Sequence, residues 1–211
     1  ELINLWKSFK WIRYPKEVHI HHTWKPTHSN FNENNHLQLH KSMKNHHIKT
    51  NGWSDIGQHL TLFPDGKWVV GRDWNINPAS ILGRNSLGFA IEMVGNFDIK
   101  GTGEYNSLGY DKLEGKQLNS ILQFLNFVNL PIIFHREYSD KTCPGTSIDK
   151  NKFIQMVKEY GSMIVNIFGK DIKLENVINQ DDLNYVQLRE LFDKMNCKVE
   201  WKDGKTTITL K

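Results

Sequence analysis

Two histidines and one cysteine have the types and positions of metal ligands. His21 and His135 each end a predicted strand, and Cys143 follows His135 by eight residues. Two imidazoles and one thiolate form a mixed nitrogen and sulfur set, which suits Zn²⁺ better than Mg²⁺ or Ca²⁺. Three protein ligands leave one tetrahedral position open for water, as in catalytic rather than structural zinc sites. These residues therefore predict a catalytic zinc centre.

Two further residues are candidates for catalysis at such a centre. Glu92 is the one charged residue in an apolar segment, and these surroundings should raise its pKa into the range of a general base. Lys141 lies two residues before Cys143, so its ammonium group can stabilise charge on a substrate carbonyl oxygen. The alternative interpretations are a salt-bridged structural glutamate and a solvated loop lysine.

The remaining histidines and the second cysteine are weaker candidates. The chain has ten histidines, and several lie in polar segments where solvation or local hydrogen bonds account for them: His28, His36, His40, His46 and His47. Cys143 lies in a polar turn, whereas Cys197 opens an alternating apolar run. Two isolated cysteines are not a disulfide framework, so we expect no bridge between them.

The elements that must position these residues alternate between strands and helices. Strands are predicted at 17–21, 87–95 and 130–135, and a hairpin at 58–71 has its turn at Pro64-Asp65-Gly66. Helices are predicted at about 32–46, at 118–128 and at 153–160. This order predicts an α/β fold, with a central mixed β-sheet flanked by helices and the zinc site at the strand ends.

The chain divides into two predicted domains. Residues 1–165 form the α/β domain, and residues 170–211 form a small α+β module of one helix and one hairpin. A unit of this size is rarely stable alone, so we expect it to dock on the first domain or to pair with another copy, which would give a homodimer.

Composition and charge exclude several classes of protein. The 211 residues are 38% hydrophobic and carry a net charge of +4, which fits one folded core and a mild attraction to anionic polymers. No basic run is interleaved with aromatics, so nucleic-acid binding is not expected. No apolar stretch approaches the about 20 residues of a membrane span. No signal peptide is visible, and the start at Glu1 suggests a processed or trimmed N-terminus.

Four separated motifs occur in an informative order. They are HIHHTW at 19–24, GWSDIGQHLTLFPDGKWVVGRD at 52–73, LGFAIEMVGNFD at 87–98 and FHREYSDKTCPG at 134–145. Together they resemble the zinc-dependent N-acetylmuramoyl-L-alanine amidases, or type 2 amidases, whose superfamily includes peptidoglycan recognition proteins. The resemblance covers roughly residues 17–157, and NPASILGRN is similar to a clostridial phage endolysin or autolysin branch.

The resemblance implies an activity and assigns roles to residues. The family cleaves the amide between N-acetylmuramic acid and L-alanine of bacterial peptidoglycan, which implies action at the bacterial cell wall. His21, His135 and Cys143 match its zinc ligands, Lys141 matches the lysine that stabilises the tetrahedral intermediate, and Glu92 matches the acidic residue that some branches use as base. His22 would then be a neighbour of the site.

The sequence departs from the family pattern at two places. Gln58 stands where many relatives have a tyrosine implicated in catalysis, so the role of the base shifts to Glu92. Pro78-Ala79-Ser80 stands where many relatives have His-Ala, which puts substrate contacts there in doubt. The superfamily also contains members that bind muropeptides without cutting them, and this remains the alternative function.

The C-terminal segment has a resemblance of its own. Residues 184–211 are similar to a small module named from the N-terminal domain of copper amine oxidases and found on bacterial surface proteins. The segment contains no histidine, so copper chemistry is not implied. Wall attachment and self-association are the roles we expect for it.

Overall fold

The structure is a computed structural model of the chain, and it describes part of the C-terminal region. The described residues are 1–99, 110–167, 170–174, 178–180, 183–185, 191–192, 194–202 and 205–210. The chain separates into two compact units, residues 1–155 and 156–211, and each unit is described by itself.

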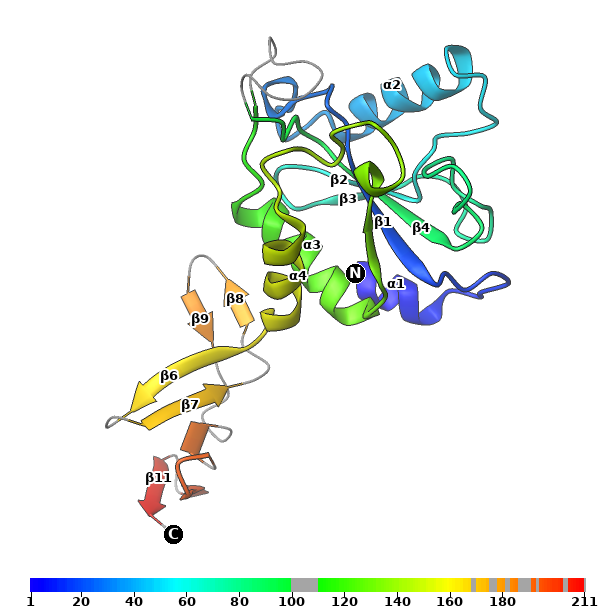
Figure 1. Cartoon of the computed structure of the whole chain (residues 1–211). Helices are drawn as coiled ribbons and strands as arrows, with labels where there is room; N and C mark the ends of the chain where they lie inside the picture. The colour runs from blue at the N-terminus through cyan, green and yellow to red at the C-terminus, as the bar shows by residue number, and fades with distance from the viewer. Residues whose placement is uncertain are drawn as a thin grey trace. The chain divides into compact units, whose positions relative to one another are not determined.

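The first unit is organised around a mixed sheet, shown in Figure 1. Within the described residues its strand order is β3-β2-β4-β1-β5. These strands are β1 (Glu17–His22), β2 (Leu60–Leu62), β3 (Trp68–Val70), β4 (Gly88–Met93) and β5 (Ile132–Phe134). Strand β1 pairs in parallel with β4 and β5, β2 pairs in parallel with β4, and β3 is antiparallel to β2. The predicted central mixed sheet is confirmed, with β4 in its middle.

The hairpin of β2 and β3 follows its turn chemistry. Phe63 N donates to Lys67 O at 2.9 Å, and Gly66 N donates to Phe63 O at 3.0 Å. Gly66 adopts a φ of +82°, a conformation that glycine reaches without a steric penalty. The predicted Pro64-Asp65-Gly66 turn is therefore confirmed.

Helices flank the sheet on two sides (Figure 1). They are α1 (Leu2–Ser8), α2 (His36–Lys49), α3 (Gly115–Val128) and α4 (Lys150–Glu159). Helix α3 buries the predicted apolar stripe and ends at Asn129, which adopts the left-handed conformation with φ of 48° and is followed by Pro131 after one residue. Helix α2 buries only Met43, as expected of a surface helix.

One face of the sheet packs against α1 and α3 through aromatic side chains. Trp6 of α1 lies with its ring centroid 4.9 Å from that of Phe89 on β4 and 5.4 Å from that of Phe124 on α3. Trp74 lies 5.7 Å from Trp6 and 5.3 Å from Phe89. These four rings, which we call the aromatic cluster, are all at most 5% exposed. Helix α1 was not predicted from the sequence.

The second unit contains antiparallel pairs of strands among its described residues. They are β6 (Met163–Ile167) with β7 (Lys170–Leu174), β8 (Ile178–Gln180) with β9 (Leu183–Tyr185), and β10 (Cys197–Lys202) with β11 (Lys205–Leu210). The predicted hairpin corresponds to β10 and β11, but its Asp203-Gly204 turn lies outside the described residues. The pairs β6–β7 and β8–β9 were not predicted. In the part of the chain that is described, no helix has the length and apolar character needed to cross a bilayer.

Candidate metal centre

Two parallel strands deliver the two predicted histidine ligands to one edge of the sheet. Ile20 of β1 is paired with Phe134 of β5. His21 is the next residue of β1, whereas His135 comes directly after the end of β5 and begins a short 3-10 helix, His135–Glu137. The carboxyl ends of parallel strands meet at the same edge, where α/β sheets bind their ligands. The two imidazole centroids lie 4.6 Å apart. The strand register therefore brings together residues separated by more than a hundred positions.

The third predicted ligand arrives on the loop after β5. Arg136 N donates to Cys143 O at 2.8 Å, and the Arg136 guanidinium donates to Gly145 O at 2.7 Å. Gly145 adopts a φ of +121°, and a Cβ there would lie 2.5 Å from the Phe97 Cβ. The loop thus passes close to Phe97, and glycine is required at this point because a side chain would clash.

The three donor groups fit a small cation. The ligand atoms of His21, His135 and Cys143 all lie within 4.8 Å of one another. The distance between His21 Nδ1 and Cys143 Sγ is 3.5 Å. Tetrahedral zinc with ordinary bond lengths requires a nitrogen-to-sulfur separation of about 3.6 Å. The residues present therefore fit a metal ion with nitrogen and sulfur ligands.

Burial controls the protonation of these groups in the metal-free protein. Burial lowers the pKa of His135 to about 4 and holds that of His21 well below its usual value, so both rings are neutral and carry a lone pair near pH 7. Burial also raises the pKa of the Cys143 thiol, which therefore keeps its proton. The His22 backbone N–H, 3.4 Å from Cys143 Sγ, favours the thiolate in part. A cation would complete the deprotonation of the thiol.

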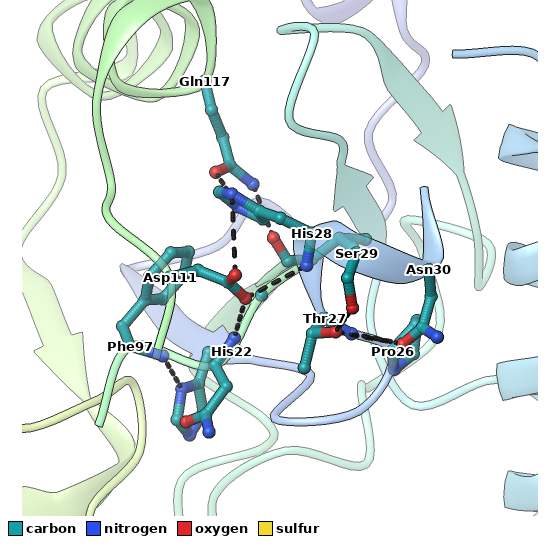
Figure 2. A network of polar contacts seen from close by, with 12 residues as sticks. His22, Pro26, Thr27, His28, Ser29, Asn30, Phe97, Asp111 and Gln117 are labelled. Atoms are coloured by element: carbon teal, nitrogen blue, oxygen red, sulfur yellow. Dashed lines mark hydrogen bonds and ion pairs between the residues drawn. The ribbon is translucent and has the colours of Figure 1, made fainter. Parts of the chain in front are cut away.

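His22 has a different environment from His21. Its Nδ1 accepts a hydrogen bond from Phe97 N at 3.2 Å, one of the contacts drawn in Figure 2. His22 does not belong to the group of donor atoms that converge around His21.

A polar network fixes the segment that follows β1 (Figure 2). The Asp111 carboxylate accepts from His28 N at 3.0 Å and from Asn96 N at 2.8 Å. The His28 ring lies 3.0 Å from Gln117 Oε1, and Gln117 Nε2 on α3 donates to Val94 O at 2.8 Å. The network ties the segment after β1 to the end of β4 and to α3. Part of this segment, including Trp24 and Asn30, lines the cavity at the strand ends.

Glu92 and Lys141 line the same cavity as the three candidate ligands. The cavity has a volume of about 820 Å³ and lies between the strand ends and α2. Glu92 is opposite His21 in the parallel register of β1 and β4. Burial raises the pKa of Glu92 to about 8, so the carboxyl holds a proton near neutral pH in the metal-free protein. The expected increase in its pKa is therefore present, with burial as its cause.

Gln58, where the sequence departs from the family pattern, is buried at the cavity wall. It is 2% exposed, and its Nε2 donates to Thr61 Oγ1 at 2.9 Å. A carboxamide has no acid–base function near neutral pH, so this residue cannot take over the chemistry of a tyrosine hydroxyl.

Ser80 belongs to the second place where the sequence departs from the family pattern, Pro78-Ala79-Ser80. It has a structural role that the sequence did not reveal. Its Oγ lies 2.9 Å from His21 Nε2 and 2.7 Å from His19 Nδ1. His19 is fully buried, and its Nε2 lies 2.7 Å from Glu17 Oε1. The alternation of a strand places Glu17, His19 and His21 on one face, which is the signal that could have identified His19. Ser80 had no comparable signal.

Several other histidines have hydrogen-bond partners of their own, as expected of satisfied structural side chains. The His36 ring lies 2.9 Å from Asp65 Oδ2, and the His40 ring lies 3.0 Å from Thr61 Oγ1. The His47 ring accepts from Gly57 N at 3.1 Å. Both cysteines are free thiols in the structure.

A family profile matches most of the first unit. It is described as N-acetylmuramoyl-L-alanine amidase, and the match covers residues 12–146. The chain belongs to this amidase family.

Relatives of the chain come from phages and animals. An endolysin of Enterobacteria phage K11 is 29% identical over 104 residues, which are 48% of this chain and 67% of the endolysin. Peptidoglycan-recognition protein SC1a of Drosophila melanogaster is 31% identical over 116 residues, 51% of this chain and 57% of that protein. An N-acetylmuramoyl-L-alanine amidase of Homo sapiens is 35% identical over 80 residues, 38% of this chain and 14% of the human protein. The chain thus spans only part of the length of each relative.

Solved structures share the fold of the chain. Drosophila PGRP-LB in complex with tracheal cytotoxin has a TM-score of 0.56 at 19% identity, covering 71% of this chain and 84% of that one. The endolysin of a Thermus scotoductus bacteriophage has a TM-score of 0.51 at 20% identity, covering 73% and 95%. At these identities the structures establish the fold alone. Family membership and the named relatives together support a function related to peptidoglycan.

Proposed function

We propose that the chain is a zinc-dependent amidase that hydrolyses the bond between N-acetylmuramic acid and L-alanine in bacterial peptidoglycan. The observation that carries the proposal is the set of donor atoms from His21, His135 and Cys143, which lie within 4.8 Å of one another. The 3.5 Å from His21 Nδ1 to Cys143 Sγ fits tetrahedral zinc, and nitrogen with sulfur ligands favours zinc over magnesium or calcium.

Glu92 and Lys141 would perform different parts of the reaction. Zinc, when bound, supplies a Lewis acid that polarises the amide carbonyl and makes water nucleophilic near neutral pH. Glu92 accepts the proton of the attacking water and returns it to the leaving amine nitrogen. In the metal-free protein burial raises the pKa of Glu92 to about 8, and a bound cation would lower that pKa, so that the carboxyl could ionise and then accept and return the proton. The Lys141 ammonium group stabilises negative charge on the carbonyl oxygen.

The cavity has the composition expected for a muropeptide ligand. It is lined by indole rings, carboxamides and imidazoles, which pack against sugar rings and hydrogen-bond to peptide groups: Trp24, Trp53, Asn30, Asn35, Asn51, His46. Its volume of about 820 Å³ is within the range of ligand sites, roughly 300–1,000 Å³. One relative was solved with tracheal cytotoxin. We therefore propose peptidoglycan as the partner and the bacterial cell wall as the place of action, as for an endolysin or autolysin.

A non-cutting recognition module is the second candidate function. Gln58 favours it, because a buried carboxamide occupies the position where many relatives have a catalytic tyrosine. The complete set of two imidazoles and a thiol argues for hydrolysis, because a module that only binds has no need of an open zinc site.

One experiment separates the two functions. Zinc content is measured in the purified chain, and peptidoglycan is assayed for new L-alanine amino termini with and without a chelator. We expect about one zinc per chain, chelator-sensitive release of amino termini and no new reducing sugar ends. Bound zinc without release would favour the recognition module, and reducing ends would indicate a glycosidase instead.

We also propose that residues 1–165 are the catalytic domain and that residues 170–211 are a wall-binding or self-associating module similar to the copper amine oxidase N-terminal-like domain. Removal of residues after 170 should weaken binding to cell walls, or abolish a homodimer in sedimentation, more than it lowers hydrolysis of a soluble muropeptide. An equal loss of binding and hydrolysis would contradict this assignment.

A further inference from the structure

A chain of buried polar contacts extends from the candidate metal ligand His21 into the protein. His21 Nε2 lies 2.9 Å from Ser80 Oγ, which lies 2.7 Å from His19 Nδ1. His19 Nε2 lies 2.7 Å from Glu17 Oε1. Arg84 completes the chain, because its Nε donates to Glu17 Oε1 at 2.8 Å and its Nη2 donates to Glu17 Oε2. The contacts therefore form one line from an ion pair to the metal centre.

The ion pair sets the direction of every hydrogen bond in this line. A carboxylate only accepts, so the neutral His19 ring must carry its proton on Nε2 and its lone pair on Nδ1. The Ser80 hydroxyl donates to that lone pair, and its oxygen then accepts from His21 Nε2. The remaining lone pair of His21 is on Nδ1. That atom faces Cys143 Sγ at 3.5 Å.

The protein holds the two intermediate groups in place. His19 has no exposed surface, and its ring fits only because residue 88 is glycine: a Cβ on Gly88 would lie 2.1 Å from His19 Cε1. Ser80 is held from the opposite side, because Asn85 Oδ1 accepts from Ser80 N and from Ile81 N, each at 3.0 Å. Neither the ring nor the hydroxyl can turn away without the loss of packing or of hydrogen bonds.

We propose that Ser80 and His19 are positioning residues that fix the tautomer of His21, so that its Nδ1 is always available to the metal. This inference rests on the proposed metal centre and deepens it. The hydrogen bond to the second nitrogen of a metal-binding histidine orients the ring and makes it a better ligand, and its loss typically lowers metal affinity by about 10- to 100-fold.

The first test needs no metal. Long-range ¹H–¹⁵N spectra of the metal-free chain report which ring nitrogen carries the proton. We expect His21 to be protonated on Nε2 alone in the wild type, and to show a mixture of tautomers in Ser80→Ala. A wild-type His21 protonated on Nδ1, or identical spectra for the two proteins, would overturn the inference.

The second test is zinc affinity, measured by competition with a chromophoric chelator. Ser80→Ala should weaken binding about 10- to 100-fold, and Ser80→Thr should restore it because the hydroxyl returns. The matched control is Ser120→Ala, which removes a hydroxyl that makes no contact with a histidine: it donates to Gly66 O at 2.8 Å and lies outside the cavity lining. The control should bind zinc as the wild type does.

The outcomes distinguish the two proposals. If the wild type binds no zinc, the proposed metal centre fails, and the tautomer spectra still decide whether Ser80 directs His21. If the wild type binds zinc and Ser80→Ala binds it equally well, the metal centre stands and the positioning role is wrong. Thermal unfolding of each variant shows whether it has folded, and the wild-type tautomer spectrum still tests the inference if Ser80→Ala has not.

Discussion

The two faces of the central sheet use opposite kinds of interaction. Toward α1 and α3, the aromatic cluster packs indole and phenyl rings whose contacts have little directional requirement. Toward the cavity, the same strands carry His21 and Glu92 among groups whose hydrogen bonds have fixed directions. The first face supplies stability through buried area, whereas the second places ionisable groups where burial disfavours their charge. Four predictions test this division.

The largest effect is expected on the aromatic face. Phe124→Ala removes a ring that is 2% exposed, and should lower the free energy of unfolding by about 3–5 kcal/mol, as for other large core truncations. Denaturant unfolding of the chain checks the value. Phe127→Ala on the same helix is the matched control, because that ring is only half-buried and should cost less. Equal losses for the two variants would show that the aromatic cluster has no special part in stability.

On the cavity face, Cys143→Ser should affect zinc binding and activity rather than the stability of the fold. The hydroxyl is a poorer zinc ligand than the thiolate, so zinc and amidase activity should be lost together, with activity lower by about 10³-fold or more. Zinc analysis and release of L-alanine amino termini measure the two losses. Activity that persists after zinc is lost would rule out the metal mechanism.

Glu92→Gln should have a smaller effect on the same face. The variant should retain zinc, while turnover falls by about 10²-fold or more, as expected when a general base is removed. The measurement is kcat for a soluble muropeptide, together with zinc content. A fully active variant would mean that the base is another group.

The smallest effect, counted per pH unit, concerns the pH dependence of stability that the buried Glu92 causes. Burial raises its pKa from the ordinary value of 4.5 to about 8 in the folded chain, so the native metal-free chain binds a proton that the unfolded chain releases. Stability from this group is complete below pH 4.5 and is lost as the pH rises toward 8, at up to about 1.4 kcal/mol per pH unit. Glu92→Gln should flatten this slope in urea unfolding of the chelated protein. An unchanged slope would contradict the protonation assigned to Glu92.

Patterns within short segments predicted the sheet and the convergence of the candidate ligands. The alternation of polar and apolar residues at 17–21 predicted β1, and the apolar run before His135 predicted β5. The turn residues Pro64-Asp65-Gly66 predicted the hairpin of β2 and β3. Parallel strands that end together then bring His21 and His135 to one edge, so the site follows from the element order.

Features that depend on distant contacts were not predictable. Helix α1 has seven residues and no side-chain cap, and Trp6 is buried only because Trp74 and Phe89 lie against it. Ser80 contacts His19 and His21 across about 60 residues of sequence, through a loop with no local signal of its position. Strands β6 to β9 are short, and no turn signal in the sequence was clear enough to define them.

The network of His28, Asp111 and Gln117 has a consequence for ligand binding. It holds the segment after β1 in one conformation, so this wall of the cavity is already ordered before a ligand arrives. Immobilising a free loop on binding costs conformational entropy, which reduces affinity. In this protein that entropy is lost during folding, and a ligand that reaches this wall meets a preorganised surface.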